Sequence, residues 1–485
     1  MSQAIVAVWA SIVASAAVSE PSPEVVKDVI ATAKQAYGGT KLERLRSVSI
    51  YSDRRLAWAG QGQTAAFVEF AVDKMIKHFD LKRRHGSVER WIRQTGNVYH
   101  NRYVVNAGGG MTLDYMEGTK TTTDNATYWA SFAPDYRVSD LLLAHYLATQ
   151  APKVTSVGSA YYDGREHHVV SFRISPQSPV LNVYVAKDDG LIRRVSMQRS
   201  FGPVTIIFAS HSQTQGLRYA RENRAFLGDT LVEYEYGLVL RVNRKLGPQF
   251  RVSSRLKAPP ERVDMSKMTV DALAPKVYMV GQSDYSMFVE HGDRYIAVNS
   301  YPGLKARYEA LVAHTKRDFP LADVVVTHHH SDHMDGISEA AELGATLHVT
   351  EQTMQVLKKS ATSTTAPIHK IGSIRILTDG DALGPLSLYV RPTPHAVENV
   401  FAYHADQHIL YQDDHYHGQN KTRFSRVQPT AYALHEVIGR LGLKVDFLLS
   451  GHARKAERWS DFEKALAQMK RDPVCPSRRR ICRDI

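Results

Sequence analysis

The segment VVVTHHHSDHMDG, residues 324–336, constrains the fold of this chain more than any other stretch. Its β-branched run is typical of a buried strand, and MDGISEAAEL after it has the pattern of a helix. Four histidines and two aspartates occupy the eight positions 328–335 at this junction. Ionisable side chains that follow a strand and precede a helix stand where α/β folds place their ligand sites. The segment therefore predicts an α/β region with a functional site at this turn.

The spacing of these residues favours a metal site. Side chains at positions i and i+2 share one face of an extended segment, so His328 and His330 can converge on one ion. His329 alternates away and is not expected to be a ligand. Asp332 and His333, turned by the entering helix, point to a neighbouring position. The alternative is a polar histidine-rich loop without a metal, which the strand–loop–helix context disfavours.

THHHSDHMDG resembles the signature of the metallo-β-lactamase fold hydrolases, and the resemblance covers residues 275–460. That family has a later histidine after a strand, an aspartate ending another strand, and a final histidine after the last core strand. Here YVRPTPHAVENV offers His395, HILYQDDHYHG offers Asp413 and Asp414, and DFLLSGHARK offers His452. The resemblance implies an αββα four-layer fold for residues 276–470, of the glyoxalase II-like or lactonase-like branch.

The resemblance also implies two zinc ions and their ligands. One zinc would be held by His328, His330 and His395, a second by Asp332, His333 and His452, and Asp414 would bridge both. The family pattern aligns Asp413 with a glycine, so Asp413 stays an alternative bridge. His415 and His417 are expected to support the site or lie at the surface. Asn299 stands where relatives commonly have an aspartate behind the metal loop; its amide can still hydrogen-bond.

This donor set predicts a hydrolase. Two zinc ions can share a hydroxide, lower its pKa and polarise a carbonyl, and Asp332 would orient that hydroxide and carry its proton. Relatives that hydrolyse β-lactams resemble one another in having cysteine or serine at the position of Asp414. An ester, thioester or lactone is therefore the expected small-molecule substrate. The alternatives are a β-lactam hydrolase, a mononuclear iron sulfur oxygenase, in which iron replaces zinc, and a periplasmic ligand-binding protein without catalysis.

The rest of the chain predicts further parts. Residues 20–255 contain short segments rich in Val, Ile, Tyr and Phe, such as LNVYVAKDDGLIRRVSMQ, which indicate an antiparallel, mostly-β α+β domain. Residues 256–275 are polar, contain prolines and lack a strand period, which is typical of a linker. Residues 471–485 form a basic tail with Cys475 and Cys482, whose pairing the sequence leaves open.

Residues 1–19 carry no charge and resemble a signal peptide with an A-x-A cleavage pattern, although a basic leading segment is missing. We therefore expect a periplasmic or secreted protein, with a cytoplasmic one as the alternative. The net charge of +12 suits anionic partners. Nucleic acid is not expected as a partner, because no nuclease domain motif accompanies the metal motif. A homodimer is one expected form of the protein.

Overall fold

The computed structural model describes residues 21–58, 60–66, 68–258, 266–360, 372–418 and 427–468. The chain divides into two compact units. The first comprises Met1–Val48, Thr127–Leu231 and Tyr236–Arg244, and the second Ser49–Ala126, Val232–Glu235 and Lys245–Ile485. The predicted signal peptide and the basic tail lie outside the described residues. Within the described ranges, no helix combines the length and apolar character needed to span a membrane.

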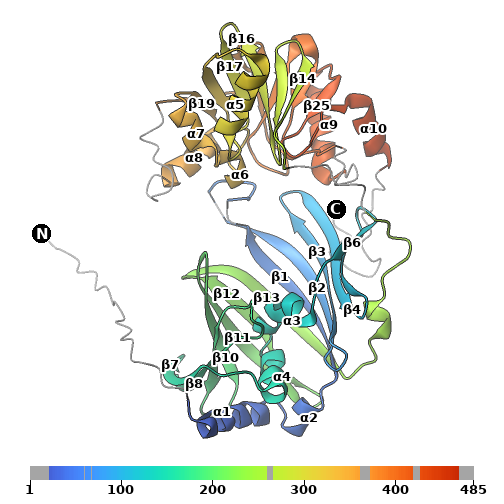
Figure 1. Cartoon of the computed structure of the whole chain (residues 1–485), viewed down its shortest axis with the longest axis vertical. Coiled ribbons are helices and arrows are strands. Elements are labelled where there is room, and N and C mark those ends of the chain that lie inside the picture. Colours follow the sequence, from blue (N-terminus) through green and yellow to red (C-terminus); the bar gives the residue numbers. More distant parts are fainter. Residues whose placement is uncertain are drawn as a thin grey trace, which may run out of the picture. The chain divides into compact units, whose positions relative to one another are not determined.

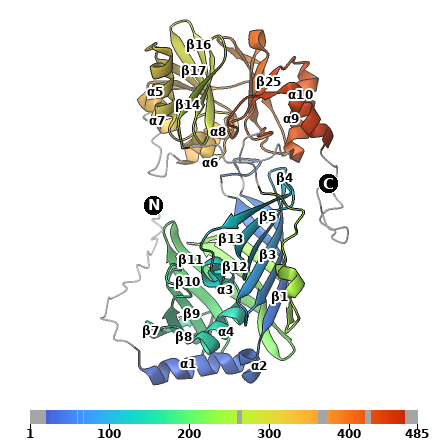
Figure 2. The same cartoon turned by 45° about the vertical axis from the view of Figure 1, so that its right-hand side comes forward.

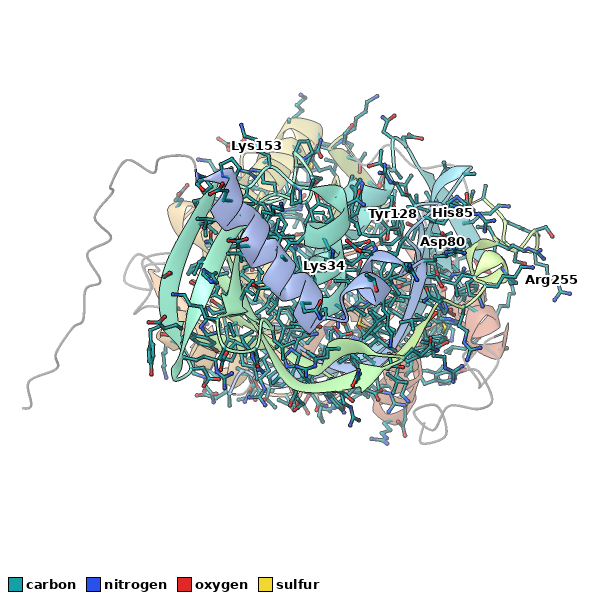
Figure 3. All side chains as sticks on the ribbon, turned by 90° about the horizontal axis from the view of Figure 1, so that it is seen from below. Lys34, Asp80, His85, Tyr128, Lys153 and Arg255 are labelled. Atoms are coloured by element: carbon teal, nitrogen blue, oxygen red, sulfur yellow. The ribbon has the colours of Figure 1, made fainter. Side chains whose placement is uncertain are left out.

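The first unit is an antiparallel sheet with helices. Its helices are α1 (Pro23–Ala36), α2 (Thr40–Glu43), α3 (Tyr128–Arg137) and α4 (Asp140–Gln150). Its strands are β7 (Ser156–Tyr162), β8 (Arg165–Phe172), β9 (Leu181–Ala186), β10 (Ile192–Arg199), β11 (Gly202–Thr214) and β12 (Leu217–Leu227). Neighbours in sequence are neighbours in the sheet. Lys34 of α1, labelled in Figure 3, pairs with Glu43 of α2 (Nζ–Oε1 2.6 Å). This unit has the antiparallel, mostly-β character that the sequence predicted.

The second unit begins with a meander of antiparallel strands. These are β1 (Ser47–Trp58), whose first residues belong to the first unit, β2 (Glu69–Asp80), β3 (His85–Gln94), β4 (Asn97–Asn106), β5 (Gly109–Asp114) and β6 (Thr119–Thr123). Strand β13 (Thr230–Val242) also has residues in both units. The short helix η1 (Gly247–Phe250) packs on the meander through Phe250, which lies in one apolar cluster with Val104 and Leu113.

Two more sheets follow in the second unit. The seven-stranded sheet runs in sequence order through β14 (Thr269–Ala274), β15 (Val277–Gly281), β16 (Tyr285–His291), β17 (Arg294–Val298), β18 (Leu321–Val325), β19 (Thr346–Val349) and β20 (Ser373–Ile376). Pairing is antiparallel up to β17 and parallel from β17 to β20. The six-stranded sheet contains β21 (Asp381–Leu383), β22 (Leu386–Arg391), β23 (Asn399–His404), β24 (Ile409–Tyr411), β25 (Phe447–Leu449) and β26 (Glu457–Arg458).

Helices accompany both of these sheets. They are α5 (Leu304–Thr315), α6 (Ser331–Met334), α7 (Ile337–Glu342), α8 (Glu351–Ser360), η3 (Ala405–Gln407), α9 (Pro429–Leu441) and α10 (Trp459–Gln468). Figures 1 and 2 show α5 and α7 beside the seven-stranded sheet, and α9 and α10 beside the six-stranded one. Helices therefore lie beside each of the two sheets.

Alternate side chains of the seven-stranded sheet enter two different cores. Met279 and Met287 pack with residues of the six-stranded sheet, such as Leu388. Val280 and Phe288 pack instead with the helices that cover the sheet. Successive residues of a strand point to opposite faces, so a strand with a core on each face needs continuous apolar sequence. YSMFVEH of β16, buried at six successive positions, satisfies this.

Two expectations from the sequence change here. Thr269–Ala274, predicted to belong to a linker, form the edge strand β14 paired with β15. The helix predicted from residue 335 begins instead as α6, breaks at Gly336 and resumes as α7. The Gly336 nitrogen donates to the Ser300 carbonyl at 2.7 Å, and a Cβ on Gly336 would lie 2.3 Å from the Tyr301 carbonyl oxygen. This approach admits only glycine. The domains 20–255 and 276–470 stay a prediction.

Candidate metal centre

The predicted ligands follow strands of two different sheets. The histidine motif follows β18 of the seven-stranded sheet. In the six-stranded sheet, His395 follows β22, Asp414 follows β24 and His452 follows β25. Strands β24 and β25 are parallel neighbours, so their C-terminal ends lie at one edge. The fold thereby gathers segments that are distant in sequence.

One group consists of His328, His330, His395 and Asp414, whose ligand atoms all lie within 4.8 Å of one another. The Nε2 atom of His395 is 3.1 Å from His328 Nε2 and 2.9 Å from Asp414 Oδ2. His328 Nε2 is 3.4 Å from the same oxygen. All four residues are buried. Imidazole nitrogens and a carboxylate oxygen are donors that zinc accepts, so this group could hold an ion.

A second group consists of His333, Asp413, Asp414 and His452. Asp414 Oδ2 is 2.9 Å from His333 Nε2, and Asp414 Oδ1 is 2.9 Å from His452 Nε2. Asp332 is close by, with Oδ2 at 3.4 Å from His333 Nε2 and 3.7 Å from His452 Nε2. Its side chain is 42% exposed. All seven predicted ligands therefore meet in one place, and Asp332 is the most exposed of them.

Asp414 is common to both groups, whereas Asp413 belongs to the second alone. The Oδ2 atom of Asp413 accepts a hydrogen bond from Thr327 Oγ1 at 2.7 Å and lies 2.7 Å from His333 Nδ1. Its Oδ1 atom accepts from the Tyr301 hydroxyl at 2.7 Å. This geometry favours Asp414 over Asp413 as the shared carboxylate. Asp413 instead lies behind His333, on the ring nitrogen that does not face Asp414.

The two departures from the family pattern, Asn299 and Asp413, contact each other. The Asn299 amide donates to Asp413 Oδ2 and to the Tyr411 hydroxyl, the latter at 3.1 Å. Asn299 has a φ of 82°, a left-handed conformation that asparagine tolerates. The carboxylate expected at position 299 is thus supplied from position 413, at the same buried place behind His333.

His330, His333 and His452 each have a partner on one ring nitrogen that orients the ring. His452 Nδ1 is 3.1 Å from Asp284 Oδ1, and His330 Nε2 is 2.9 Å from the Gly62 carbonyl oxygen. His333 is held in the same way by its carboxylate partner. Metal-binding histidines characteristically donate their other ring N–H to a carboxylate or carbonyl, which fixes the tautomer. His330 Nδ1 is buried without a hydrogen-bond partner. A nitrogen in that state fits an ion as its partner.

Burial and charge set the protonation of the group. Burial holds the pKa of His328 well below its ordinary value. Burial also lowers the pKa of His333, but the Asp413 and Asp414 carboxylates prevail and raise it well above its usual range. For His452, the Asp414 charge overcomes burial and raises the pKa to about 10. Without an ion, His333 and His452 therefore keep protons that an ion must displace, which makes metal binding pH-dependent.

The remaining nearby histidines lie outside both groups. His329 Nε2 is 2.9 Å from the Gly62 carbonyl oxygen, and the exclusion of His329 from the ligands stays a prediction. His415 is buried, with Nε2 at 2.8 Å from Thr393 Oγ1, and burial together with the charge of His395 lowers its pKa to about 3. His417 Nδ1 is 3.5 Å from a serine hydroxyl. His415 and His417 border the site as neighbours.

Sequence reasoning missed four contributors to the site: Gln61, Gly62, Asp284 and Tyr301. Gln61 Nε2 donates to Asp332 Oδ1 at 2.7 Å. The Tyr301 hydroxyl, whose pKa burial and Asp413 raise well above its usual range, lies 3.2 Å from His452 Nε2. Tyr301 lies two residues after Asn299, so its position beside a residue already linked to the metal loop could have indicated its role. Nothing in the local pattern around Gln61 or Gly62 indicates contact with a motif far along the chain.

No protein-family model and no curated protein matches the chain. Solved structures to which it is similar include a metallo-beta-lactamase from Hirschia baltica, with 16% identity and a TM-score of 0.32 over 41% of this chain and 96% of that one. Another is a metallo-beta-lactamase from Pontibacter korlensis, with 17% identity and a TM-score of 0.32 over 42% of this chain and 100% of that one. A third is FIM-1 from Pseudomonas aeruginosa in the mono-zinc form, with 18% identity and a TM-score of 0.32 over 43% and 96%. At such values the assignment of function rests on the side chains of the site.

Proposed function

We propose that the chain is a metal-dependent hydrolase of the metallo-β-lactamase superfamily that binds two zinc ions. One observation carries the proposal: two groups of ligand atoms, mostly from buried residues, share the single carboxylate of Asp414. A carboxylate between two groups of imidazoles is the donor arrangement of a two-metal site. The two sheets with helices beside each of them support the αββα four-layer arrangement as the frame of this site.

The contacts support the ligand assignment that the resemblance implies. The first ion would be held by His328, His330, His395 and Asp414, and the second by Asp332, His333, His452 and Asp414. Two ions in these positions would polarise a substrate carbonyl and lower the pKa of a water molecule. Iron is the alternative metal, because imidazole and carboxylate also suit it.

The residues of the chain would do the following. Asp413 and Asp284 would keep the second ring nitrogens of His333 and His452 protonated, so that both Nε2 atoms face Asp414. Asp332, which is partly exposed beside these histidines, would accept a proton from the attacking water and return it to the leaving group. His328, His330, His333 and His395 are buried and would limit the access of competing water to the ions.

We infer that the substrate is an ester, thioester, lactone or related carbonyl compound. The support is Asp414 itself, which stands where relatives that hydrolyse β-lactams resemble one another in having cysteine or serine. A β-lactam would then be a secondary substrate. A sulfur oxygenase with one iron would leave the second group without an ion, although its four members are as well gathered as those of the first.

Elemental analysis of the purified protein tests the proposal. We expect about two zinc ions per chain, falling to one or none in Asp414→Ala. Asp188 is an exposed residue of the first unit, and Asp188→Ala is the matched control, which should bind metal as the wild type does. Hydrolysis of aryl ester, thioester and lactone probes should fall in parallel with the metal content. One iron per chain with oxygen-dependent turnover would replace the proposal by the oxygenase, and no metal after reconstitution would refute both.

A further inference from the structure

The loop between β1 and β2, residues 60–66, lies against the segments that carry the proposed ligands, all within the second unit. The Ser331 nitrogen donates to the Gly60 carbonyl at 3.1 Å, beside the histidine motif. The Val397 nitrogen donates to the Gln63 carbonyl at 2.9 Å, beside His395. The loop is thus hydrogen-bonded through its backbone to two of the ligand-bearing segments.

The Gly62 carbonyl determines where a histidine proton lies. Its oxygen is 2.9 Å from Nε2 of His330 and 2.9 Å from Nε2 of His329. A carbonyl oxygen can only accept, and it has two lone pairs, so both rings must carry their proton on Nε2. Nδ1 of His330 then has no proton. Because this nitrogen is buried and has no hydrogen-bond partner, it is the atom left for an ion.

Gln61 acts on the most exposed carboxylate of the centre. Its amide nitrogen is 2.7 Å from Asp332 Oδ1 and 3.2 Å from the Ser331 hydroxyl. The other oxygen of Asp332 faces His333. A neutral amide donor fixes one oxygen of the carboxylate and leaves its charge available to the centre. Without it, a side chain that is 42% exposed would be free to turn towards solvent.

We propose that this loop is a positioning element of the metal centre, in which Gln61 orients Asp332 and the Gly62 carbonyl selects the tautomer of His330. The inference rests on the proposed two-metal site and deepens it. Its consequence is that a part of the chain far upstream of every proposed ligand acts on both ions: Gln61 on the second through Asp332, and Gly62 on the first through His330. Gln61 is a positioning residue, because it acts on the reaction only through Asp332.

Metal affinity in the full-length protein tests the role of Gln61. We expect Gln61→Ala to raise the dissociation constant of one zinc ion per chain, the second, about 10-fold, measured by competition with a chromophoric chelator, and to leave that of the first unchanged. Gln61→Glu places a carboxylate against Asp332 and should weaken the ion further. The spectrum of the cobalt-substituted protein should change in both variants. On an ester probe, kcat should fall while KM stays within about 2-fold.

Two further variants separate this role from bracing of the loop. Gln213→Ala removes an exposed glutamine of β11 in the first unit and should leave both affinities unchanged. Gln63→Ala removes a side-chain bond from the same loop to the Thr393 carbonyl, which is not a ligand. An equal loss of affinity in Gln63→Ala and Gln61→Ala would overturn the proposal. Two ions bound by Gln61→Ala as tightly as by the wild type would also overturn it.

The tautomer of His330 gives a readout that needs no metal. Nitrogen NMR of the metal-free protein, assigned by comparison with His330→Gln, should show the proton on Nε2. A proton on Nδ1 would refute the role of Gly62. A wild-type protein that binds no metal would refute the proposed function and the affinity part of this inference together. The wild-type metal content therefore distinguishes a failure of the proposed site from a failure of the loop.

Discussion

The buried carboxylate of Asp413 offers the sharpest test of how the second ion is held. Asp413→Asn keeps the shape of the side chain but replaces one accepting oxygen by an NH2 group. Thr327, Tyr301 and His333 approach its two oxygens at 2.7 Å each. Whichever way the new amide turns, its nitrogen faces at least one donor. His333 then loses the carboxylate that keeps its outer ring nitrogen protonated.

The expected loss can be bounded. Removing the carboxylate partner of a metal-binding histidine typically costs about 10- to 100-fold in metal affinity, or about 1.4 to 2.8 kcal/mol. Chelator competition with the purified protein should show this loss for one ion per chain. Asn299→Asp combined with Asp413→Asn returns a carboxylate to the same place and should recover most of the affinity. The exposed Asp188→Asn is the matched control. Full affinity in Asp413→Asn, or a double variant no better than the single one, would refute this account of His333.

Three further outcomes follow from the same structure. Burial lowers the pKa of His145 to about 4 in the folded chain, so the unfolded state takes up the proton first as pH falls. The free energy of unfolding should therefore fall by about 3 kcal/mol between about pH 6.5 and pH 4 because of His145. Denaturant unfolding of His145→Leu should show a smaller fall over the same pH range, and an unchanged fall would contradict the assignment. Removing bound metal with a chelator should lower the thermal midpoint by about 5 to 10 °C if free zinc had been at about 100 times its dissociation constant. Asp414→Ala, which keeps one ion or none, should show a smaller shift or none. Gly336→Ala forces a Cβ to 2.3 Å from the Tyr301 carbonyl oxygen and should lower both stability and metal content. Gly344→Ala is the control, because its Cβ would meet no atom and the substitution is disfavoured only by the φ of 75°. Equal stability of Gly336→Ala and the wild type would refute the close contact.

The sequence was most informative where pattern and chemistry are local. The histidine motif shows its strand, its turn and its donors within thirteen residues. The order of the later ligands followed from the resemblance. The choice between Asp413 and Asp414 needed the structure, because neighbouring residues after a strand differ only in direction. The sequence did not predict residues 269–274 as a strand, because an edge strand that is only partly buried needs little apolar sequence.

The contacts of Gln61 and Gly62 could not be predicted from the local sequence, for a different reason. A backbone carbonyl has no residue type, so no pattern marks Gly62 as the partner of two histidines. Gln61 lies in GQGQTAA, a polar turn of a kind common between antiparallel strands. Only the folded chain places this turn beside Asp332. Contacts of this kind depend on tertiary packing and have no periodic signature.

The Gly62 carbonyl also bears on how such a chain can be inherited. The residues that would bind metal all lie after position 327, yet a group that fixes one of them lies before position 63. A gene fragment encoding only the later part would carry every proposed ligand and lack this support. Recombination at the boundary between them would therefore yield a protein with its ligands intact and its centre loosened. A proposed metal centre of this kind would therefore depend on both parts of the chain together.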